Sequence, residues 1–417
     1  MKKVLGYYVS TPLILRIAIG LVIGILLGLL LPKATLIAVF GTVFVGALKA
    51  IAPILVFVLV IASLIKAGTG IGGRFSTVIV FYILSTFLAA VFAVAAMFIF
   101  RVTIPLGDAY QTTAPAGLGE VFSALLTNMV ANPIAAIING NYVGILTWSV
   151  VLGLALRKLA GEKTKEVAND ISAAVSAVVA WIIQLAPFGI MGLVFSSVSE
   201  YGLEIFTDYG KLLLVLVGCM LAVALVIDPL LVGLALRRNP YPLVFRCLRE
   251  SGITAFFTRS SAANIPVNMS LCERLGLDKE YYSVAIPLGA TINMDGAAIT
   301  ITVMSLAAAF SQGISVNIII AILLSFVATL GACGASGVAG GSLLLIPMAC
   351  SLLGVGADVA MQMVGVGFII GVVQDSLETA INSSGDVLFC AAAEFRDRMK
   401  KGERISFFEK GTDTTAE

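Results

Sequence analysis

Long runs of hydrophobic residues alternate with short polar segments along most of the chain. Eight of these runs reach or approach the ~20 residues that a helix needs to cross the hydrocarbon core of a bilayer. They cover about residues 12–32, 36–65, 76–100, 141–156, 173–198, 209–236, 283–311 and 359–392. The pattern predicts an all-α integral membrane protein with eight transmembrane helices, and it leaves 244–282 and 313–358 unassigned.

The composition agrees with a chain whose main partner is the lipid bilayer. Of its 417 residues, 59% are hydrophobic and 12% are charged, whereas about 25% are charged in an ordinary soluble domain. The net charge is only +2, which gives no reason to expect nucleic acid as a partner. Lys2 and Lys3 precede the first hydrophobic run, but no clear cleavage site follows Pro32. We therefore expect an uncleaved first helix.

The positive charges predict which loops face the cytoplasm. Lys and Arg gather at residues 2–3, 66–74, 157–165, 237–249, 274–279 and 396–410. None occurs between Arg101 and Arg157. Cytoplasmic loops carry the excess of Lys and Arg, so these clusters indicate the inner face and place both termini in the cytoplasm.

Two segments do not fit simple membrane crossings. Cations flank 250–273 on both sides, so this segment should enter and leave by the same face, with the tip TRSSAANIP. Segment 313–353 lacks cations, and its centre, GACGASGVAGGS, is too rich in Gly for a helix interior. Irregular backbone at membrane depth must be buried in protein or line a wet cavity. The sequence thus predicts two opposed re-entrant hairpins that meet at a site, as in secondary transporters with inverted repeats.

Polar residues occur in three segments that would lie at membrane depth. On the last span, Asp375, Thr379, Asn382 and Asp386 follow at i, i+4, i+7 and i+11, which places them within about 40° on one helix face. Glu378 lies at the margin of this stripe.

The other two polar segments are the first hairpin tip and the seventh span. The tip offers Arg259, Ser260, Ser261 and Asn264. The seventh span contains ATINMDGAAI, in which Asn293 and Asp295 precede Gly296, a residue expected to loosen the helix.

These residue types favour the binding of a hard cation. A carboxylate inside the membrane costs at least ~2.5 kcal/mol, so it needs a partner, an ion or water. Hard oxygen donors suit alkali or alkaline-earth cations, and the chain has no His. The six cysteines include no CxxC, which is typical of packing residues. The alternative is a closed network in which these polar groups hydrogen-bond only to one another and bind no ion or substrate.

Three classes of function compete for this pattern. An ion channel needs a continuous pore lined by repeated carbonyls or charges, whereas the polar residues here gather at one depth. An intramembrane protease without His would need an Asp pair, and no other catalytic signature accompanies Asp375 or Asp386. We therefore favour a secondary transporter and expect no enzymatic activity.

Four motifs resemble those of a known family. SSAANIPVN, PLGATINMDGAA, GASGVAGGS and the last-span pattern D-x3-T-x2-N-x3-D that starts at Asp375 are similar to those of the dicarboxylate/amino acid:cation symporters, which include the glutamate transporters. The resemblance covers nearly the whole chain and implies the glutamate-transporter fold. Within that family, FFTRSSAANIPVN and QDSLETAINSSGDVLF look like the sodium-coupled serine/threonine transporters.

The resemblance implies an architecture and a mechanism. Family members are homotrimers in which a transport domain moves like an elevator against a trimerisation scaffold. By this resemblance the chain is a single transporter unit of a bacterial-type cytoplasmic (inner) membrane. Its scaffold elements would be 12–65 and 141–198, its transport elements 76–100 and 209–392, and its cytoplasmic tail 393–417. The co-transported ion would be Na⁺, and the substrate serine, threonine or, alternatively, another amino acid or a dicarboxylate.

The resemblance also assigns residues to the ion sites. One sodium ion would lie among Gly289, Asn293, Asn382 and Asp386. A second, deeper ion would use Tyr82, Ser85, Thr86, Asn293 and Asp295. A third would lie near Thr291, but the second hairpin departs from the acidic amino acid members at Ala332, Ala335 and Ala339, so the sodium stoichiometry stays open.

The substrate site follows from the same resemblance. The amino group would meet Asp375, and the carboxylate would meet Asn382 and the region of Ser261, with Ser260 or Thr379 as a hydroxyl partner for the side chain. Val338 at the tip of the second hairpin would close over the substrate.

Position 378 separates this chain from the acidic amino acid transporters. They commonly have, or support, an Arg at this position, whereas this chain has Glu378. A carboxylate here would repel a second substrate carboxylate. We expect Arg259 to pair with Glu378 and to leave a small uncharged pocket. The alternative is that Glu378 points to water.

Overall fold

The computed structural model describes residues 11, 13–66, 72–106, 126–333, 340–403 and 405–407. Within these ranges the chain folds into helices without strands, which confirms the expected all-helical class. Six helical stretches of the described chain are long and apolar enough to cross a membrane. They are Thr35–Ala62, Arg74–Phe100, Glu162–Ile183, Ala186–Leu236, Lys279–Ser311 and Ala357–Lys400.

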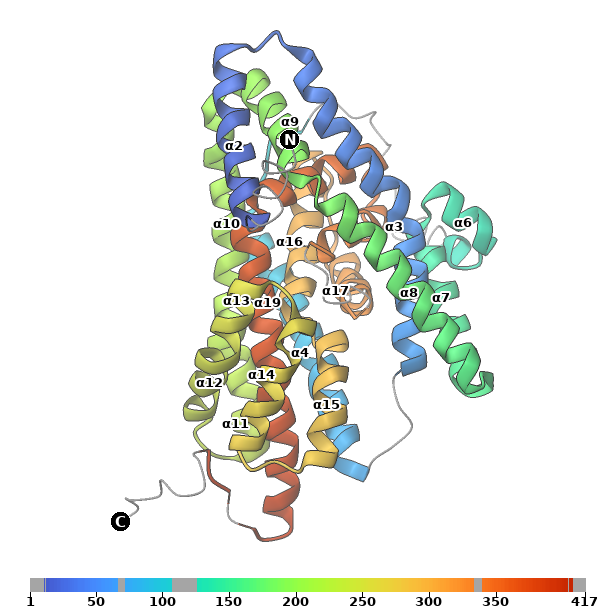
Figure 1. Ribbon diagram of the computed structural model, residues 1–417, viewed down its shortest axis with the longest axis vertical. Coiled ribbons are helices and arrows are strands. Elements are labelled where there is room, and N and C mark those ends of the chain that lie inside the picture. Colours follow the sequence, from blue (N-terminus) through green and yellow to red (C-terminus); the bar gives the residue numbers. More distant parts are fainter. Residues whose placement is uncertain are drawn as a thin grey trace.

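One group of helices forms the upper end and one side of the molecule (Figure 1). It consists of α2 (Leu13–Leu30), the short η1 (Thr35–Ile37), α3 (Ala38–Lys66), α6 (Pro133–Asn139), α7 (Tyr142–Leu159), α8 (Glu162–Ile183) and α9 (Ala186–Tyr201). In this group α3 packs against α7, α8 and α9, and α2 packs along α9.

Glycines bring α2 and α9 into backbone contact. A Cβ added at Gly20 would lie 2.2 Å from the carbonyl oxygen of Pro187, and one at Gly24 would lie 2.6 Å from that of Met191. A Cβ at Gly28 would lie 2.9 Å from Val198. Small residues at a spacing of four allow this approach, so this face of α2 accepts no side chain.

The second group of helices surrounds α19 (Ala357–Lys400), which runs along the long axis of the molecule (Figure 1). Before the first hairpin segment it contains α4 (Gly72–Phe100), η2 (Gly202–Glu204), α10 (Ile205–Ala222), the π-helical turn η3 (Val223–Ile227) and α11 (Asp228–Leu236). Then follow α12 (Tyr241–Cys247), the π-helical turn η4 (Leu248–Gly252), α13 (Ile253–Thr258), α14 (Ser261–Arg274), α15 (Lys279–Ile292) and α16 (Asp295–Ser311). The last members before α19 are α17 (Ile318–Ala332), η5 (Ser342–Leu345) and α18 (Ile346–Leu352). The centre of this group is α16, which is buried from Asp295 to Ala309.

Two of the predicted spans are interrupted in the structure. The run 283–311 is divided into α15 and α16 at Asn293 and Met294, because Asn293 leaves the helical conformation with φ −92° and ψ 87°. Gly296 does not loosen the helix as expected. It lies inside α16, where a Cβ would be 2.7 Å from the Cα of Glu378, so it allows α16 to approach α19.

The fifth predicted span, 173–198, has the wrong bounds. The helical region begins earlier, at Glu162 of α8, and it is interrupted between Ile183 and Ala186 before α9 continues to Tyr201. Pro187 stands in the first turn of α9, where its missing N–H and its effect on the preceding residue favour a helix start.

The first hairpin segment turns at Arg259. This residue has φ 51° in the left-handed region and ends α13, and the extended Ser260 caps α14. The two helices pack against each other and against α19. The helical arm that leads into the turn is continuous through α12, η4 and α13, and α14 leads away from the turn with 14 residues. For the second hairpin segment the structure describes α17, η5 and α18, and residues 334–339 lie outside the described ranges.

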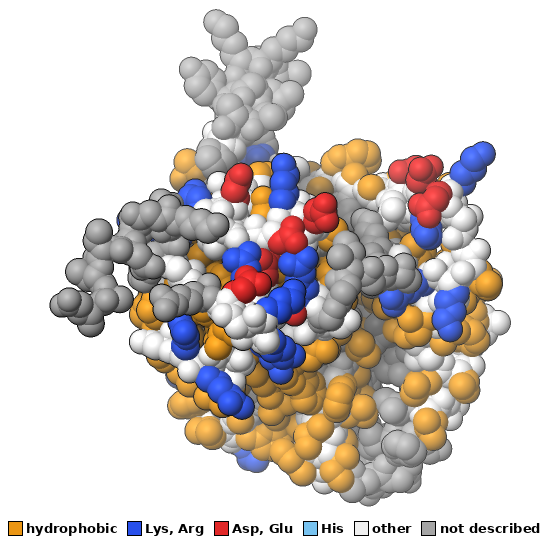
Figure 2. Space-filling view, turned by 90° about the horizontal axis from the view of Figure 1, so that it is seen from below, with side chains coloured by type: hydrophobic (Ala, Val, Ile, Leu, Met, Phe, Trp, Pro, Cys, Tyr) orange, Lys and Arg blue, Asp and Glu red, His pale blue; other side chains and the backbone are white. Residues whose placement is uncertain are grey.

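Charged side chains gather at the lower end of the molecule. Figure 2 shows Lys, Arg, Asp and Glu together on this face, with hydrophobic side chains over much of the surrounding surface. At this end α4 and α15 begin and α14 and α19 end (Figure 1). The charged end therefore belongs to the helices that surround α19.

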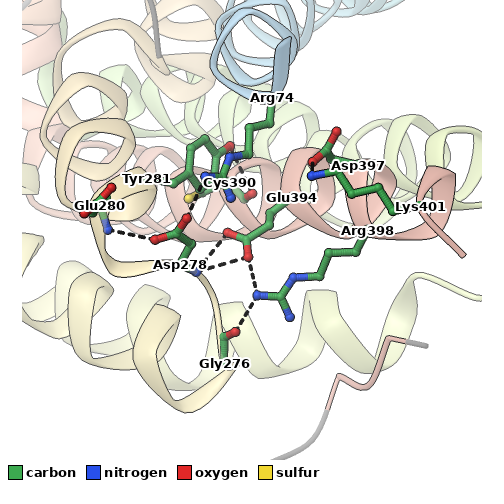
Figure 3. Close-up of polar contacts among 10 residues, drawn as sticks. All are labelled: Arg74, Gly276, Asp278, Glu280, Tyr281, Cys390, Glu394, Asp397, Arg398 and Lys401. Carbon is green, nitrogen blue, oxygen red and sulfur yellow. Dashed lines mark hydrogen bonds and ion pairs between the residues drawn. The ribbon is translucent and has the colours of Figure 1, made fainter. Parts of the chain in front are cut away.

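Ion pairs and hydrogen bonds tie these helix ends together (Figure 3). Arg74 of α4 pairs with Asp278, the cap of α15, at 2.6 Å. The Asp278 N–H donates to the buried Glu394 of α19, which also pairs with Arg398. The hydrogen bond from Arg74 lowers the pKa of Asp278. We call Arg74, Asp278, Glu394 and Arg398 the end cluster, since they join α4, α15 and α19.

Candidate functional site

The polar stripe predicted on the last span is buried at the centre of the molecule. Asp375, Thr379, Asn382 and Asp386 are each at most 7% exposed. The middle of the stripe faces the interruption between α15 and α16. Asn382 Oδ1 accepts a 2.8 Å hydrogen bond from the N–H of Gly296, and Asn293 Nδ2 donates to the Asn382 carbonyl at 2.9 Å.

Asp295 lies in a set of oxygen atoms from α4 and the interruption. Its Oδ1 accepts hydrogen bonds from Ser85 Oγ at 3.0 Å and from Thr86 Oγ1 at 2.8 Å. Ser85 Oγ also lies 3.3 Å from Asn293 Oδ1. Asp295 Oδ2 is buried and has no hydrogen-bond partner. We call Ser85, Thr86, Asn293 and Asp295 the deep oxygen site.

Asp386 lies beside this site. Its Oδ1 accepts a 3.2 Å hydrogen bond from Asn293 Nδ2, and its buried Oδ2 has no partner. The Tyr82 hydroxyl donates to the Asp386 carbonyl at 3.0 Å. A Cβ at Gly289 would lie 2.8 Å from both Asp386 Oδ1 and the Tyr82 hydroxyl, so only glycine leaves room here.

The structure thus brings together eight of the nine residues expected around sodium: Tyr82, Ser85, Thr86, Gly289, Asn293, Asp295, Asn382 and Asp386. The ninth, Thr291, is half-buried and donates its hydroxyl to the carbonyl of Leu288 at 2.7 Å. Among the described residues, no side-chain hydrogen bond joins Thr291 to the other eight.

The two carboxylates of this region lack a compensating positive charge. Asp295 and Asp386 are fully buried, and neither forms an ion pair with Lys or Arg in the part of the chain that the structure describes. A buried carboxylate is costly unless it is paired or binds a cation. The same described residues contain no group of three His, Cys, Asp or Glu side chains suited to a metal ion. Carboxylate, amide and hydroxyl oxygens fit an alkali cation better than a transition metal.

Arg259 pairs with Asp375, not with Glu378. The guanidinium donates through both Nε and a terminal nitrogen to Asp375 Oδ2, each at 2.6 Å. Asp375 Oδ1 accepts a 3.0 Å hydrogen bond from the N–H of Gly340. Asp375 therefore joins α19 to the α13–α14 turn and to Gly340, two residues before η5. The expected pair of Arg259 with Glu378 is wrong, because the turn presents its Arg to the carboxylate three positions earlier.

Glu378 has three hydroxyl and amide partners. Its Oε2 accepts hydrogen bonds from Thr300 Oγ1 at 2.8 Å, Ser342 Oγ at 2.8 Å and Gln374 Nε2 at 2.5 Å. Glu378 is 6% exposed, so the alternative that it points to water is also wrong. The sequence analysis missed Thr300, Ser342 and Gln374, of which only Gln374, one turn before Glu378, carried a signal.

The remaining residues of the first hairpin tip have structural partners. Ser260 Oγ accepts from the N–H of Ala263 at 3.2 Å and caps α14, whose first residue, Ser261, is buried. Asn264 Nδ2 donates to Ser383 Oγ of α19 at 2.7 Å.

Two more residues expected at the substrate site belong to other segments. On α19, the Thr379 hydroxyl donates to the Asp375 carbonyl at 2.7 Å. Val338 lies outside the described residues.

Comparison with known proteins identifies the family. Residues 13–394 match the model of the sodium:dicarboxylate symporter family, and the chain belongs to this family. It is 58% identical over 409 residues to the protein named serine/threonine transporter SstT of Bifidobacterium adolescentis, an alignment that covers 98% of this chain and 95% of that protein. It is 56% identical over 403 residues to a Streptococcus thermophilus protein of the same name, with 96% of this chain and 100% of the relative covered. A third relative of that name, from Streptococcus agalactiae, is 58% identical over 396 residues, 94% of this chain and 98% of the relative.

Proposed function

We propose that this protein couples the import of serine and threonine to sodium ions. The observation that carries the proposal is the pair of buried carboxylates, Asp295 and Asp386, each with one oxygen atom that has no hydrogen-bond partner. Family membership and the names of the relatives support the same reading. The role is transport, not enzymatic catalysis.

The proposed ions occupy two positions. One lies among the carbonyl of Gly289 and the side chains of Asn293, Asn382 and Asp386. The other lies in the deep oxygen site, with Tyr82 beside it. Each position would give a cation one unpartnered carboxylate oxygen, and hard oxygen ligands suit sodium. A third ion near Thr291 remains a prediction from the resemblance.

The proposed substrate position lies between Asp375 and the start of α14. An amino acid zwitterion needs one anion and several hydrogen-bond donors. Asp375 would receive the ammonium group, which then competes with Arg259 for Oδ2. Asn382 and the N–H groups at Ser261, at the positive end of α14, would receive the carboxylate.

Glu378 would select against acidic substrates. Its hydrogen bonds to Thr300, Ser342 and Gln374 hold a carboxylate one turn from Asp375, and among the described residues no Lys or Arg forms an ion pair with Glu378 itself. A second substrate carboxylate that lies beside Glu378 would be repelled by it. Serine and threonine carry no such group, and the Ser260 or Thr379 region offers hydroxyl partners.

The proposed architecture has eight transmembrane helices and two opposed re-entrant hairpins. Arg259 of the α13–α14 turn and Gly340, two residues before η5, both reach Asp375, which supports the meeting of two hairpins at one site. The contacts of α2 with α9 and of α3 with α7, α8 and α9 are more extensive than those of this group with α18, α19 and η5, which supports a scaffold and a transport domain that move as an elevator. The charged lower end (Figure 2) fits the cytoplasmic face. We further propose a homotrimer in the bacterial inner membrane with both termini in the cytoplasm.

Reconstituted vesicles test this function. Serine uptake should saturate, require an inward sodium gradient and be inhibited by threonine but not by aspartate. Uptake without sodium dependence would contradict the symport, and uptake of aspartate at the rate of serine would contradict the proposed selectivity. A conductance without substrate uptake would indicate a channel.

A further inference from the structure

A groove on the surface of the protein follows α11 to the turn that leads into α12, in the lower part of the molecule (Figure 1). It encloses about 560 Å³, which lies within the range of ~300–1,000 Å³ that is usual for ligand pockets. Its lining includes Val226, Leu230, Leu234, Arg237, Arg238 and Tyr241. None of these residues belongs to the proposed ion positions or to the proposed substrate position.

One part of the lining is apolar and exposed. Val226, Leu230 and Leu234 are 56%, 56% and 69% exposed, and their spacing of four residues places them on one helix face. We call them the apolar stripe, and exposed patches of this kind are typical of surfaces that contact a membrane. The stretch from Val226 to Arg237 covers about 16 Å of helix, which is about half of the ~30 Å hydrocarbon core. The groove therefore has about the length of one bilayer leaflet.

Two cations stand at one end of the apolar stripe. Arg237 ends α11 with φ 51° in the left-handed region, and its N–H donates to the carbonyl of Gly233 at 2.8 Å. Arg238 follows it, and both side chains are exposed. Among the described residues, neither Arg237 nor Arg238 forms an ion pair with an acid. This end of the groove therefore carries two positive charges without a counter-charge from the described part of the chain.

The turn that completes the groove is held in place by the fold. The Tyr241 hydroxyl donates to the carbonyl of Leu225 at 3.1 Å, and the Tyr241 ring stacks on Phe245 with the centroids 5.8 Å apart. A Cβ at Gly233 would lie 3.5 Å from Pro240, so the turn lies close to the backbone of α11. A site that is formed in advance pays less ordering entropy when a ligand binds.

We propose that this groove binds a phospholipid with an anionic headgroup. Its phosphate would contact Arg237 and Arg238, and one acyl chain would lie along the apolar stripe. A guanidinium binds phosphate through two parallel N–H donors, and basic pockets beside membrane-spanning helices suit acidic phospholipids. A zwitterionic lipid brings its own cation, which competes with the two arginines for the phosphate. The site is separate from the proposed transport function and does not depend on it.

Lipid binding can be measured by thermal unfolding. Purified protein in dodecyl maltoside micelles, without serine, is melted with a rising mole fraction of phosphatidylglycerol at constant ionic strength. A lipid that binds the folded state raises the melting temperature by mass action. We expect the mole fraction that gives half of the maximal rise to increase about fivefold in Arg237→Gln and in Arg238→Gln. An Arg near an anionic lipid surface contributes about 1 kcal/mol, which corresponds to that factor.

The matched control is Arg249→Gln. It removes the same charge from an exposed Arg of the adjoining η4, outside the groove, so its half-saturating mole fraction should equal that of the unmodified protein. An equal shift in Arg249→Gln, or no shift in Arg238→Gln, overturns the proposal. If Arg237→Gln does not fold because of the left-handed backbone at that position, Arg238→Gln decides alone.

The acyl chain has a test of its own. Leu234→Asn should raise the half-saturating mole fraction at least about threefold, because contact with the lipid chain is lost. Leu214→Asn on α10 should not, although Leu214 is similarly exposed, at 72% against 69% for Leu234. Equal responses of the two variants contradict a lipid chain along the apolar stripe.

Other occupants of the groove give different results. Phosphatidylcholine with the same acyl chains should need at least about fivefold more lipid, and glycerol 3-phosphate, which has no acyl chain, should not raise the melting temperature. Equal stabilisation by either compound overturns the proposal. If Arg238→Gln changes the oligomeric mass in light scattering and leaves the response to phosphatidylglycerol unchanged, the groove contacts a second copy of the chain and the lipid proposal is wrong.

Discussion

The ion pair between Arg259 and Asp375 sets a measurable energetic link between the α13–α14 turn and α19. The two side chains are 12% and 4% exposed, and two donors of the guanidinium reach the same carboxylate oxygen. Removal of one partner from a buried pair costs about 3–5 kcal/mol, because the other charge stays buried. The slight exposure of Arg259 favours the lower end, about 3 kcal/mol for Asp375→Asn or for Arg259→Gln.

A double-mutant cycle tests this magnitude. If both single variants and the double variant each lose about 3 kcal/mol of unfolding free energy, the coupling energy is also about 3 kcal/mol. Equilibrium unfolding in mixed micelles with increasing SDS gives the four free energies. Arg74→Gln with Asp375→Asn is the control, since Arg74 lies in the end cluster and its effect should add within about 0.5 kcal/mol.

The same cycle also tests the proposed competition with substrate. In saturating serine the coupling should fall to about 1 kcal/mol or less, because the ammonium group replaces Arg259 at Asp375. A coupling below about 0.5 kcal/mol without serine would refute the ion pair as an energetic link. A coupling that serine leaves unchanged would refute the replacement of Arg259.

Three other changes have expected outcomes. Asp386→Asn should unfold cooperatively but lose the sodium dependence of serine uptake, because the ion position loses its charged ligand; equal sodium activation curves would exclude Asp386 from that position. Gly24→Val should lower the unfolding free energy by about 2 kcal/mol or more, since its Cβ meets the Met191 carbonyl at 2.6 Å; Gly46→Ala, with nothing within 4 Å of its Cβ, is the control. Asp278→Asn should destabilise the end cluster at neutral pH and not at low pH. The lowered pKa of Asp278 contributes stability above its unfolded value of about 3.9, and this contribution is lost as the pH falls through the folded value. Parallel urea melts at pH 7 and pH 3 measure the difference, and an equal effect at both would contradict this linkage.

The polar stripe on α19 was predictable because all of its residues lie in one continuous helix. Asp375, Thr379, Asn382 and Asp386 repeat with the helical period in one uninterrupted segment, so their common face follows from spacing alone. The motif at Asn293 and Asp295 was also predictable as a polar site. Its conformation was not predictable, since at the interruption Asn293 contacts Asn382 and Asp386, which lie 89 and 93 residues later in the chain.

The partners of Glu378 and Arg259 depend on tertiary register. Asp375 and Glu378 are three residues apart on one helix, so the sequence alone allows either acid to meet the Arg. The packing of α13 and α14 on α19 brings Arg259 to Asp375 and not to Glu378. Glu378 instead accepts hydrogen bonds from Ser342 of η5 and Thr300 of α16.

The contact between α2 and α9 affects how variation in this chain should be interpreted. Gly20, Gly24 and Gly28 touch neither the ion positions nor the substrate position, yet every replacement adds atoms where another backbone or side chain already lies. In a scan of all single substitutions, these glycines should tolerate as little change as Asp386. The two kinds of intolerance differ in what restores function. Lower temperature or a compensating small residue on α9 should rescue a glycine variant, whereas neither supplies the missing charge of an Asp386 variant.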